Sequence, residues 1–322
     1  MPDQSWSMHQ HTIVRQDILH AVVHSMTMAA QPAISIALSM LNAAATIERA
    51  LRSLQLQTLS DWELLLFDDG STDDSIARVR AIADARIRIV ADGQRLGLAA
   101  RLNQAIDLAR APLLARMDAD DIAYPERLER QRAFLQANSE IDLLGSGMMV
   151  FANDGRPIGL YPVRQTHSEI CSRPYAGFYL AHPTWMGRTQ WFRRWRYDAG
   201  CRRAQDQDLL LRSHAHSRFA VLPEPLTGYR QDAVSVKKSM MSRYALASAF
   251  ARASRRDGKH AAGALAVGLQ AAKFAFDALA ITSGLSGRLL SRRTATCTEA
   301  EAARWREVWR ATEPSEQPSC AA

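Results

Sequence analysis

The sequence predicts an α/β fold: a mostly parallel, Rossmann-like sheet flanked by helices, followed by a helical extension at the C-terminus. Three observations predict it. Apolar runs alternate with stretches of helical periodicity over residues 33–121, acidic residues directly follow two of those runs, and the composition becomes basic and alanine-rich after residue 235. Strand, helix and strand follow one another within about 35 residues, a spacing typical of βαβ units, whose strands pair in parallel.

The first βαβ unit opens the predicted sheet. Residues 33–38 are apolar and predict a buried strand, and Asn42 is a suitable N-cap for the helix that follows. In that helix, apolar residues recur every three or four positions over residues 47–54. Residues 62–67 predict a second buried strand, which leads directly into Asp68-Asp69-Gly70-Ser71-Thr72-Asp73.

The same order is then repeated. Residues 86–90 alternate like a half-exposed strand, residues 102–109 carry an apolar stripe at helical spacing, and residues 113–117 predict a buried strand that ends at Asp118-Ala119-Asp120-Asp121. Ligands of open α/β sheets bind beyond the carboxyl ends of the strands. Because both acidic groups follow such ends, we expect them to converge on one crevice.

The later part of the chain is less regular. Pro125 suits the first position of a helix, residues 143–151 predict a strand, and Asn153-Asp154-Gly155 is a turn signal that could close a hairpin. We expect a domain boundary near Ser235. The resulting regions are an N-terminal extension (residues 1–31), the α/β domain (residues 32–235, with halves 32–121 and 122–235) and a basic helical C-terminal region (residues 236–322).

The net positive charge is confined to the C-terminal region. Residues 236–322 hold 14 Lys or Arg against 7 Asp or Glu, which accounts for the whole formal charge of +7. A basic patch at one end of a chain suits an anionic membrane surface or an anionic partner better than a nucleic-acid groove, so no nucleic-acid partner is expected.

The cysteines and the first residues indicate a cytoplasmic protein. The 4 Cys are scattered without a Cys-x-x-Cys pair or zinc-finger spacing, which argues against a disulfide framework and structural zinc. The first 31 residues lack the uninterrupted apolar segment of a secretory signal.

Asp118 and Asp120 are the strongest candidates for a metal site. They follow the apolar run Leu113-Leu114-Ala115, and an unpaired carboxylate in an apolar setting costs on the order of several kcal/mol, so a cation is expected beside them. Their spacing places both on one side of an extended segment, where they could hold Mn2+ or Mg2+. Such ions keep positions for substrate phosphates, so the substrate is expected to carry a diphosphate. The alternative role for this cluster is capping the helix near Pro125, which fits Asp121.

The order and spacing of these motifs resemble the family 2 glycosyltransferases with the GT-A fold, over about residues 33–235. The residues that carry the resemblance are Ile34-Ser35-Ile36, Asn42, Gln57-Thr58, Asp68-Asp69-Gly70-Ser71-Thr72-Asp73, Gly97-Leu98, Asn103, Arg116-Met117-Asp118-Ala119-Asp120-Asp121, Pro125-Glu126-Arg127-Leu128, His182-Pro183-Thr184, Gln205-Asp206-Gln207-Asp208-Leu209, Arg212 and Tyr229-Arg230. The resemblance implies that Asp69 contacts the nucleotide. It implies that Asp118 and Asp120 form the Asp-x-Asp motif, which binds the metal on the sugar-nucleotide diphosphate.

The resemblance also implies a general base. Asp206 matches the Asp of a Glu-Asp pair that deprotonates the acceptor hydroxyl, and an inverting transfer needs such a carboxylate opposite the leaving diphosphate. The chain departs from the family at Gln205, where Glu is usual, and the alternative role for Asp206 is a helix N-terminal Asp favoured by the dipole. Asp208 would face elsewhere on a helix and is the weaker candidate.

A second departure lies at Ser39-Met40-Leu41-Asn42, where the family commonly shows Pro-Thr-Tyr-Asn. Ser39 keeps a hydroxyl that could contact the nucleotide, but the aromatic residue is missing. The resemblance favours a UDP-sugar as donor, and this departure leaves the identity of the base open.

The resemblance as a whole implies an inverting, metal-dependent glycosyltransferase that moves a sugar from a nucleoside-diphosphate donor to a hydroxyl. In this interpretation residues 32–121 bind the nucleotide sugar and residues 122–235 the acceptor, a glycan or lipid-linked sugar of envelope polysaccharide or lipopolysaccharide synthesis, at the cytoplasmic face of the membrane. Two rivals stay open. One is a sugar-nucleotide nucleotidylyltransferase, whose usual Gly-rich phosphate loop is missing at residues 39–42; the other is a non-catalytic scaffold with a decayed site, which Gln205 favours.

Two further segments carry alternatives. Six Arg interleave with aromatic residues over residues 188–203, a mixture that fits either a phosphate-bearing acceptor or a partly buried loop. Residues 261–290 are apolar but contain Lys273 and Asp277, so a membrane-spanning helix is not expected. A helix lying on an anionic bilayer is one interpretation of this segment, and packing on the α/β domain is the favoured one.

Overall fold

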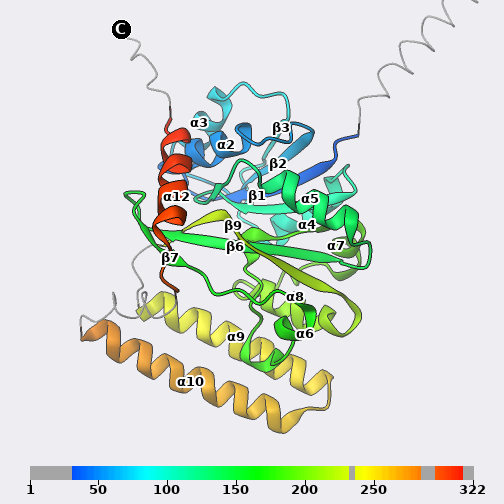
Figure 1. Cartoon of the computed structure of the whole chain (residues 1–322). Helices are drawn as coiled ribbons and strands as arrows, with labels where there is room; N and C mark the ends of the chain where they lie inside the picture. Colours follow the sequence, from blue (N-terminus) through cyan, green and yellow to red (C-terminus); the bar gives the residue numbers. More distant parts are fainter. Residues whose placement is uncertain (1–30, 232–235, 284–293, 315–322) are drawn as a thin grey trace, which may run out of the picture.

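The computed structural model describes residues 31–231, 236–283 and 294–314 (Figure 1). Within these residues, nine strands form one mixed sheet in the order β3-β2-β1-β4-β8-β6-β9-β5, with β7 paired to β6. The strands are β1 (Ile34–Met40), β2 (Trp62–Asp68), β3 (Ile87–Ala91), β4 (Leu113–Asp118), β5 (Ile122–Ala123), β6 (Leu143–Phe151), β7 (Pro157–Leu160), β8 (Met186–Arg188) and β9 (Phe219–Arg230).

Helices cover both faces of the sheet. They are α2 (Ile47–Gln55), α3 (Ser75–Ala81), α4 (Leu98–Leu108), α5 (Arg127–Ala137), α6 (His167–Ile170), α7 (Thr189–Trp195), α8 (Gln205–Ser213), α9 (Val236–Arg256), α10 (His260–Thr282) and α12 (Glu299–Ala311), with short 3-10 helices η1 (Pro174–Ala176), η2 (His182–Thr184) and η3 (His214–His216). On β2, Leu64 and Leu66 belong to one buried apolar cluster, and Leu65 and Phe67 belong to another. Both faces of this strand are therefore buried, which explains why its sequence is continuously apolar.

The first four strands confirm the two predicted βαβ units. β1 pairs in parallel with β2 and with β4, and β2 pairs in parallel with β3. The register sets Ser39 opposite Asp118 and Met40 opposite Asp68. Because the carboxyl ends of the three central strands are level, the two acidic segments lie at one edge of the sheet, as expected.

The second half of the domain extends the sheet. β6 matches the strand predicted over residues 143–151, and the predicted hairpin turn joins it to β7. β6 pairs in parallel with β9, and the register shifts at Gly147, where a Cβ would lie 2.6 Å from the carbonyl oxygen of Pro223. Glycine therefore permits the close approach of the proline-containing strand. The end of β9 carries Tyr229 and Arg230 towards the acidic edge.

Two local predictions are wrong. Helix α2 begins at Ile47, so Asn42 does not cap it. Asn42 has a φ of 51°, a left-handed conformation that Asn tolerates, and its side-chain oxygen accepts a hydrogen bond from the backbone N of Thr72 at 2.8 Å. It thereby ties the end of β1 to the loop after β2. Helix α5 begins at Arg127 rather than at Pro125.

The C-terminal region has two separate parts (Figure 1). Helices α9 and α10 form a hairpin at one end of the molecule, next to α8. Helix α12 returns to the sheet, where the buried Trp305 packs with its ring centroid 4.6 Å from that of Phe151 in β6. The predicted boundary near Ser235 and most of the N-terminal extension, residues 1–30, lie outside the described residues.

Candidate active site

A cleft of about 1410 Å³ opens at the carboxyl edge of the parallel strands. We call it the main cleft. Its lining includes four of the five predicted site residues: Ser39 in β1, Asp69 directly after β2, Asp118 in β4 and Asp206 in α8. The fifth, Asp120, lines an adjoining hollow of about 610 Å³ that also touches Ser39 and Asp118. The structure thus brings both acidic segments and Asp206 to one place.

Three carboxylates meet after β4. Asp118, Asp120 and Asp121 each offer an oxygen within 4.8 Å of the other two. Asp121 is fully buried, and its Oδ1 accepts a hydrogen bond from the backbone N of Arg230 at 3.1 Å. Its Oδ2 has no hydrogen-bond partner among the described residues. Asp121 therefore belongs to the acidic cluster, and its expected role as a helix cap is wrong.

The acidic cluster holds more negative charge than its surroundings compensate. Burial and then the negative charge of the neighbouring Asp118 raise the pKa of Asp120 to about 6. Burial, then the charges of Asp118 and Asp120, raise the pKa of Asp121 well above its usual range. An orphaned buried carboxylate oxygen beside two further carboxylates is the donor set that a hard divalent cation prefers, so these residues fit Mn2+ or Mg2+.

Arg116 is a part of the site that the sequence did not single out. Its guanidinium is buried at the main cleft and forms an ion pair with Asp118. The Nε and Nη1 atoms of Arg116 have no hydrogen-bond partner among the described residues. Unpaired buried donors are costly, so this side chain is prepared for an anionic or hydroxyl-bearing ligand.

Asp69 organises the wall of the main cleft. Its Oδ1 accepts hydrogen bonds from the backbone N atoms of Leu96 at 2.8 Å and Gly97 at 3.0 Å, and from Nε of Arg101 at 3.1 Å. Arg101 is buried and also pairs with Asp92 at 2.7 Å. The carboxylate therefore positions the loop that begins α4, and any contact with a nucleotide would be made alongside these bonds.

Asp206 occupies the first turn of α8 and faces the main cleft. Burial raises its pKa, against the opposing effect of a hydrogen bond that Nε2 of Gln207 donates at 3.3 Å and of the charge on Arg116. The residue that departs from the family, Gln205, is buried beside it, and its Oε1 has no partner among the described residues. Asp208 turns away towards α9, as the helical spacing predicts.

The segment before α8 is held mainly by structural contacts. Tyr197 is buried, its hydroxyl lies 2.8 Å from Nε2 of His182, and its backbone exchanges two hydrogen bonds with the Asn103 side chain. Burial lowers the pKa of His182 well below its usual range, so this ring is neutral. Arg188 donates to three backbone carbonyls, which supports the buried-loop interpretation for that part. Arg202 and Arg203 line the main cleft.

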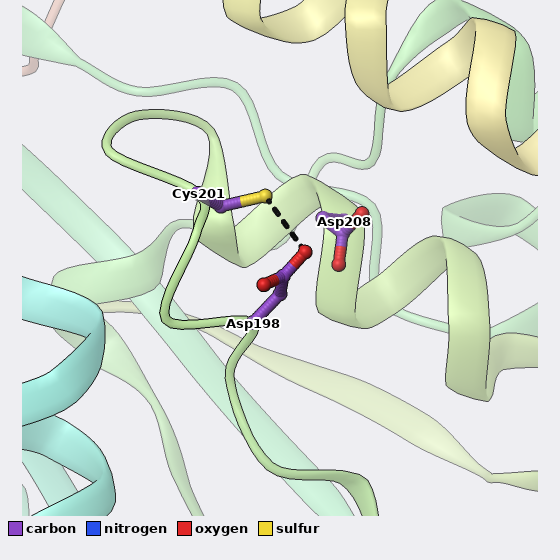
Figure 2. A group of neighbouring side chains, drawn as sticks. All are labelled: Asp198, Cys201 and Asp208. Carbon is purple, nitrogen blue, oxygen red and sulfur yellow. Dashed lines mark hydrogen bonds between the residues drawn. The ribbon is translucent and has the colours of Figure 1, made fainter.

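A second cluster of potential metal ligands lies between α8 and the loop that precedes it (Figure 2), and one of its members, Cys201, also lines the main cleft. Asp198, Cys201 and Asp208 bring their ligand atoms within 4.8 Å of one another. Here Nη2 of Arg252 is 3.0 Å from both the Cys201 sulfur and Oδ1 of Asp208, and Nε of Arg212 is 2.9 Å from Oδ2 of Asp208. Burial, then the charge of Asp208, raises the pKa of Cys201 to about 11, so it is a thiol. The arginines compensate the charge of this cluster, which fastens α8 to α9.

The family model of glycosyl transferase family 2 matches residues 35–196. EpsE of Bacillus subtilis, named as a glycosyltransferase, is 31% identical over 215 residues, which are 64% of this chain and 76% of EpsE. The O-antigen biosynthesis glycosyltransferase WbnJ of Escherichia coli is 29% identical over 63% of this chain and 81% of its own length.

Solved structures of similar fold include complexes with nucleotide sugars. S. aureus TarS in complex with UDP-GlcNAc is 18% identical, covers 87% of this chain and 81% of that chain, and has a TM-score of 0.55. The mannosyltransferase PcManGT from Pyrobaculum calidifontis, in complex with GDP-Man and Mn2+, is 16% identical, covers 88% and 86% of the two chains, and has a TM-score of 0.53. At these identities the likeness concerns the fold. The chain therefore belongs to glycosyl transferase family 2 and is a glycosyltransferase with the GT-A fold.

Proposed function

We propose that this glycosyltransferase is an inverting, metal-dependent enzyme that moves a sugar from a nucleoside-diphosphate donor to a hydroxyl of a glycan or lipid-linked acceptor. The expected donor is a UDP-sugar, in line with the UDP-GlcNAc complex of TarS, although PcManGT binds GDP-Man. WbnJ, a relative in O-antigen biosynthesis, supports a role in envelope polysaccharide or lipopolysaccharide synthesis. Such a reaction would take place in the cytoplasm, at the inner face of the cell membrane.

The observation that carries this proposal is the shared cleft of Asp118 and Asp206. Asp206 accepts the proton of the acceptor hydroxyl while the hydroxyl attacks the sugar. Because the pKa of Asp206 is raised, it lies nearer to neutral pH than the pKa of an exposed Asp, and the ionised side chain is therefore a stronger base. Fixing donor and acceptor in one cleft also removes much of the entropic barrier of a reaction between two substrates.

Asp118, Asp120 and Asp121 would hold the Mn2+ or Mg2+. When bound, such an ion supplies neutralisation of the charge that grows on the departing diphosphate. Arg116 adds a second, permanent positive charge on the same side of the cleft, and its free nitrogens can donate to a phosphate or a sugar hydroxyl. Asp69 and Ser39 position the nucleotide, with Asp69 acting at least through the loop that it holds.

The two rivals are separable. A nucleotidylyltransferase is disfavoured because the end of β1 and the residues after it, Ser39 to Asn42, contain no glycine to wrap a phosphate. A decayed, non-catalytic scaffold would bind a donor without turning it over. The buried amide of Gln205 is the feature that favours the scaffold.

A panel of nucleoside-diphosphate sugars tests the proposal. We expect one donor to raise the melting temperature, and to do so only with Mn2+ or Mg2+, because a ligand that binds the folded state stabilises it. We also expect slow hydrolysis of that donor by the wild-type protein and much slower hydrolysis by the Asp206→Asn variant, which should still bind. Donor binding without any turnover in the wild type would favour the scaffold, and no binding to any donor would refute the proposal.

A further inference from the structure

Helix α10 buries polar side chains and exposes large apolar ones, the reverse of the usual arrangement in a soluble protein. Its buried residues are Gly263, Ala266, Gln270, Asp277 and Ala280. Its exposed residues include large apolar ones: Leu265 is 66% exposed, Leu269 46%, Phe276 54% and Leu279 68%. These four recur with Ala262 and Ala272 at alternating spacings of three and four, so they form one stripe along the helix. We call these six residues the outer stripe.

Hydrogen bonds and an ion pair attach α10 to α9, whereas the large leucines of α10 face outwards. Nη2 of Arg243 lies 3.0 Å from Oδ2 of Asp277, Nη1 of the same arginine lies 3.2 Å from Oε1 of Gln270, and the Ser239 hydroxyl donates to Asp277 at 2.9 Å. Gly263 allows Ser254 to approach closely. The hairpin is therefore held in an orientation that leaves the outer stripe uncovered among the described residues.

The size of this apolar surface needs an explanation. Soluble proteins scatter exposed apolar side chains singly, whereas contiguous patches mark interaction sites. By length and composition alone, α10 is long and apolar enough to cross a membrane, and 17% of its most apolar window is buried. Met240 and Tyr244 of α9, 47% and 76% exposed, add to the apolar surface of the hairpin.

The charge of the hairpin identifies the occupant. Residues 236–283 contain eight Lys or Arg and two Asp. Both acids are engaged within the protein: Asp277 pairs with Arg243, and Asp257 pairs with Arg256 and accepts a hydrogen bond from Tyr175 at 3.1 Å. Arg252 is engaged as well, because it pairs with Asp208 of α8. The other cations of the hairpin would repel the same surface of a second copy, but they would attract anionic lipid headgroups.

We infer that the α9–α10 hairpin docks on an anionic bilayer, with the outer stripe inserted among the lipids and the basic residues at the headgroups. A spanning arrangement is disfavoured because the Arg243–Asp277 pair and α9 occupy one whole side of α10. Ser242 of α9 lines the main cleft, and Arg203 of the cleft lies 3.5 Å from it. Docking therefore holds the cleft beside the membrane, where, if the proposed function is right, a lipid-linked acceptor would be presented.

Vesicle flotation of the full-length protein tests the inference. We compare neutral phosphatidylcholine vesicles with vesicles containing phosphatidylglycerol, and the wild type with the double variant Leu265→Glu/Phe276→Glu. Leu108→Glu is the matched control, because Leu108 is 41% exposed on α4, outside the hairpin. We expect the wild type and the control to float with anionic vesicles. The fraction of the double variant that floats should be at least tenfold smaller than that of the wild type.

Other results would overturn the inference. Wild-type protein that fails to float, or a double variant that floats as well as the wild type, would refute docking through the outer stripe. A wild type that is dimeric without lipid, together with a monomeric double variant, would assign the stripe to a second copy. Protein that stays with the membrane after alkaline carbonate extraction would indicate a spanning helix.

A separate measurement keeps this inference apart from the proposed function. All substituted positions lie outside the main cleft, so donor hydrolysis in solution should be equal in the wild type, the double variant and the control. If flotation succeeds and no donor is hydrolysed, the proposed function fails and the docking stands. If hydrolysis succeeds and flotation fails, the docking alone is wrong.

Discussion

Two clusters of acidic side chains in this molecule look alike by distance and differ in charge. In each, three potential metal ligands lie within 4.8 Å of one another. In the cluster of Asp198, Cys201 and Asp208, the side chains of Arg212 and Arg252 pair with Asp208. After β4, Asp118 has Arg116 as an ion-pair partner, whereas Asp121 keeps a buried oxygen without a partner among the described residues.

The difference teaches that closely spaced ligand atoms alone do not indicate a metal site, because the two clusters differ in how much of their charge the surrounding cations compensate. In the acidic cluster at the end of β4, burial and the charge of Asp118 raise the pKa of Asp120 to about 6, which means that ionising all three carboxylates without a further cation is unfavourable. In the cluster that contains Asp208, two arginines supply the positive charge. That cluster therefore serves to fasten α8 to α9.

The largest expected effect separates two aspartates that are two residues apart on α8. Replacing Asp206 with Asn should lower the transfer rate by about 10²- to 10⁴-fold, the usual contribution of a general base. Asp208→Asn should retain most of the activity, because Asp208 faces the arginines and not the main cleft. Initial rates of nucleotide release at saturating donor measure both, and equal losses in the two variants would show that the assignment is wrong.

The second prediction concerns the pH dependence of the transfer. A base must be ionised to accept a proton, and burial raises the pKa of Asp206, so its ionised fraction falls at a higher pH than it would for an exposed Asp. Activity should therefore drop up to about tenfold per pH unit on the acidic side of that pKa. This drop in activity at acidic pH should be absent from the residual activity of Asp206→Asn. If the variant shows the same drop, another group must be responsible for it.

The third prediction concerns stability. Asp208→Asn removes the charge that Arg212 and Arg252 share, and should lower the free energy of unfolding by about 1 to 2 kcal/mol, since these arginines are partly exposed. Asp198→Asn, at an exposed position of the same cluster, should change it by less than about 0.5 kcal/mol. Urea denaturation followed by circular dichroism compares them. Equal effects would show that the arginine pairs contribute little.

The smallest effect is expected at Cys201. Because its pKa is raised to about 11, the thiolate is scarce at neutral pH and alkylation should be slow. Labelling by iodoacetamide at pH 8, followed by peptide mass spectrometry, should proceed at least several-fold more slowly than for a free cysteine, and should accelerate as the pH rises. Fast labelling at pH 7 would mean that the thiol is ionised and that this cluster is less compensated than its contacts indicate.

Much of the site followed from strand order alone. Ser39, Asp69 and Asp118 converge because parallel strands end at one edge, a consequence of topology that the periodicity of the sequence already predicts. Asp121 was misassigned because its surroundings come from β9: its partner, the backbone N of Arg230, is 109 residues away. Long-range burial of this kind leaves no local pattern.

The C-terminal helices show the same limit. The apolar spacing of residues 261–290 fits a helix packed on the domain as well as one on a membrane, because a stripe does not state which way it faces. The pairing of Asp277 with Arg243 shows which side of the helix faces the protein, since it turns the polar side of α10 inwards. The unpaired nitrogens of Arg116 could not be predicted either, because an arginine in a sequence is assumed to be exposed until its burial is known.

Binding of Mn2+ tests the central claim most directly. Electron paramagnetic resonance counts free Mn2+, so a titration in the presence of UDP gives the number of ions bound per chain. The account predicts a single tight site in the wild type and in Asp208→Asn, and its loss in Asp120→Asn. Unchanged binding in Asp120→Asn, or loss of the ion in Asp208→Asn, would contradict it.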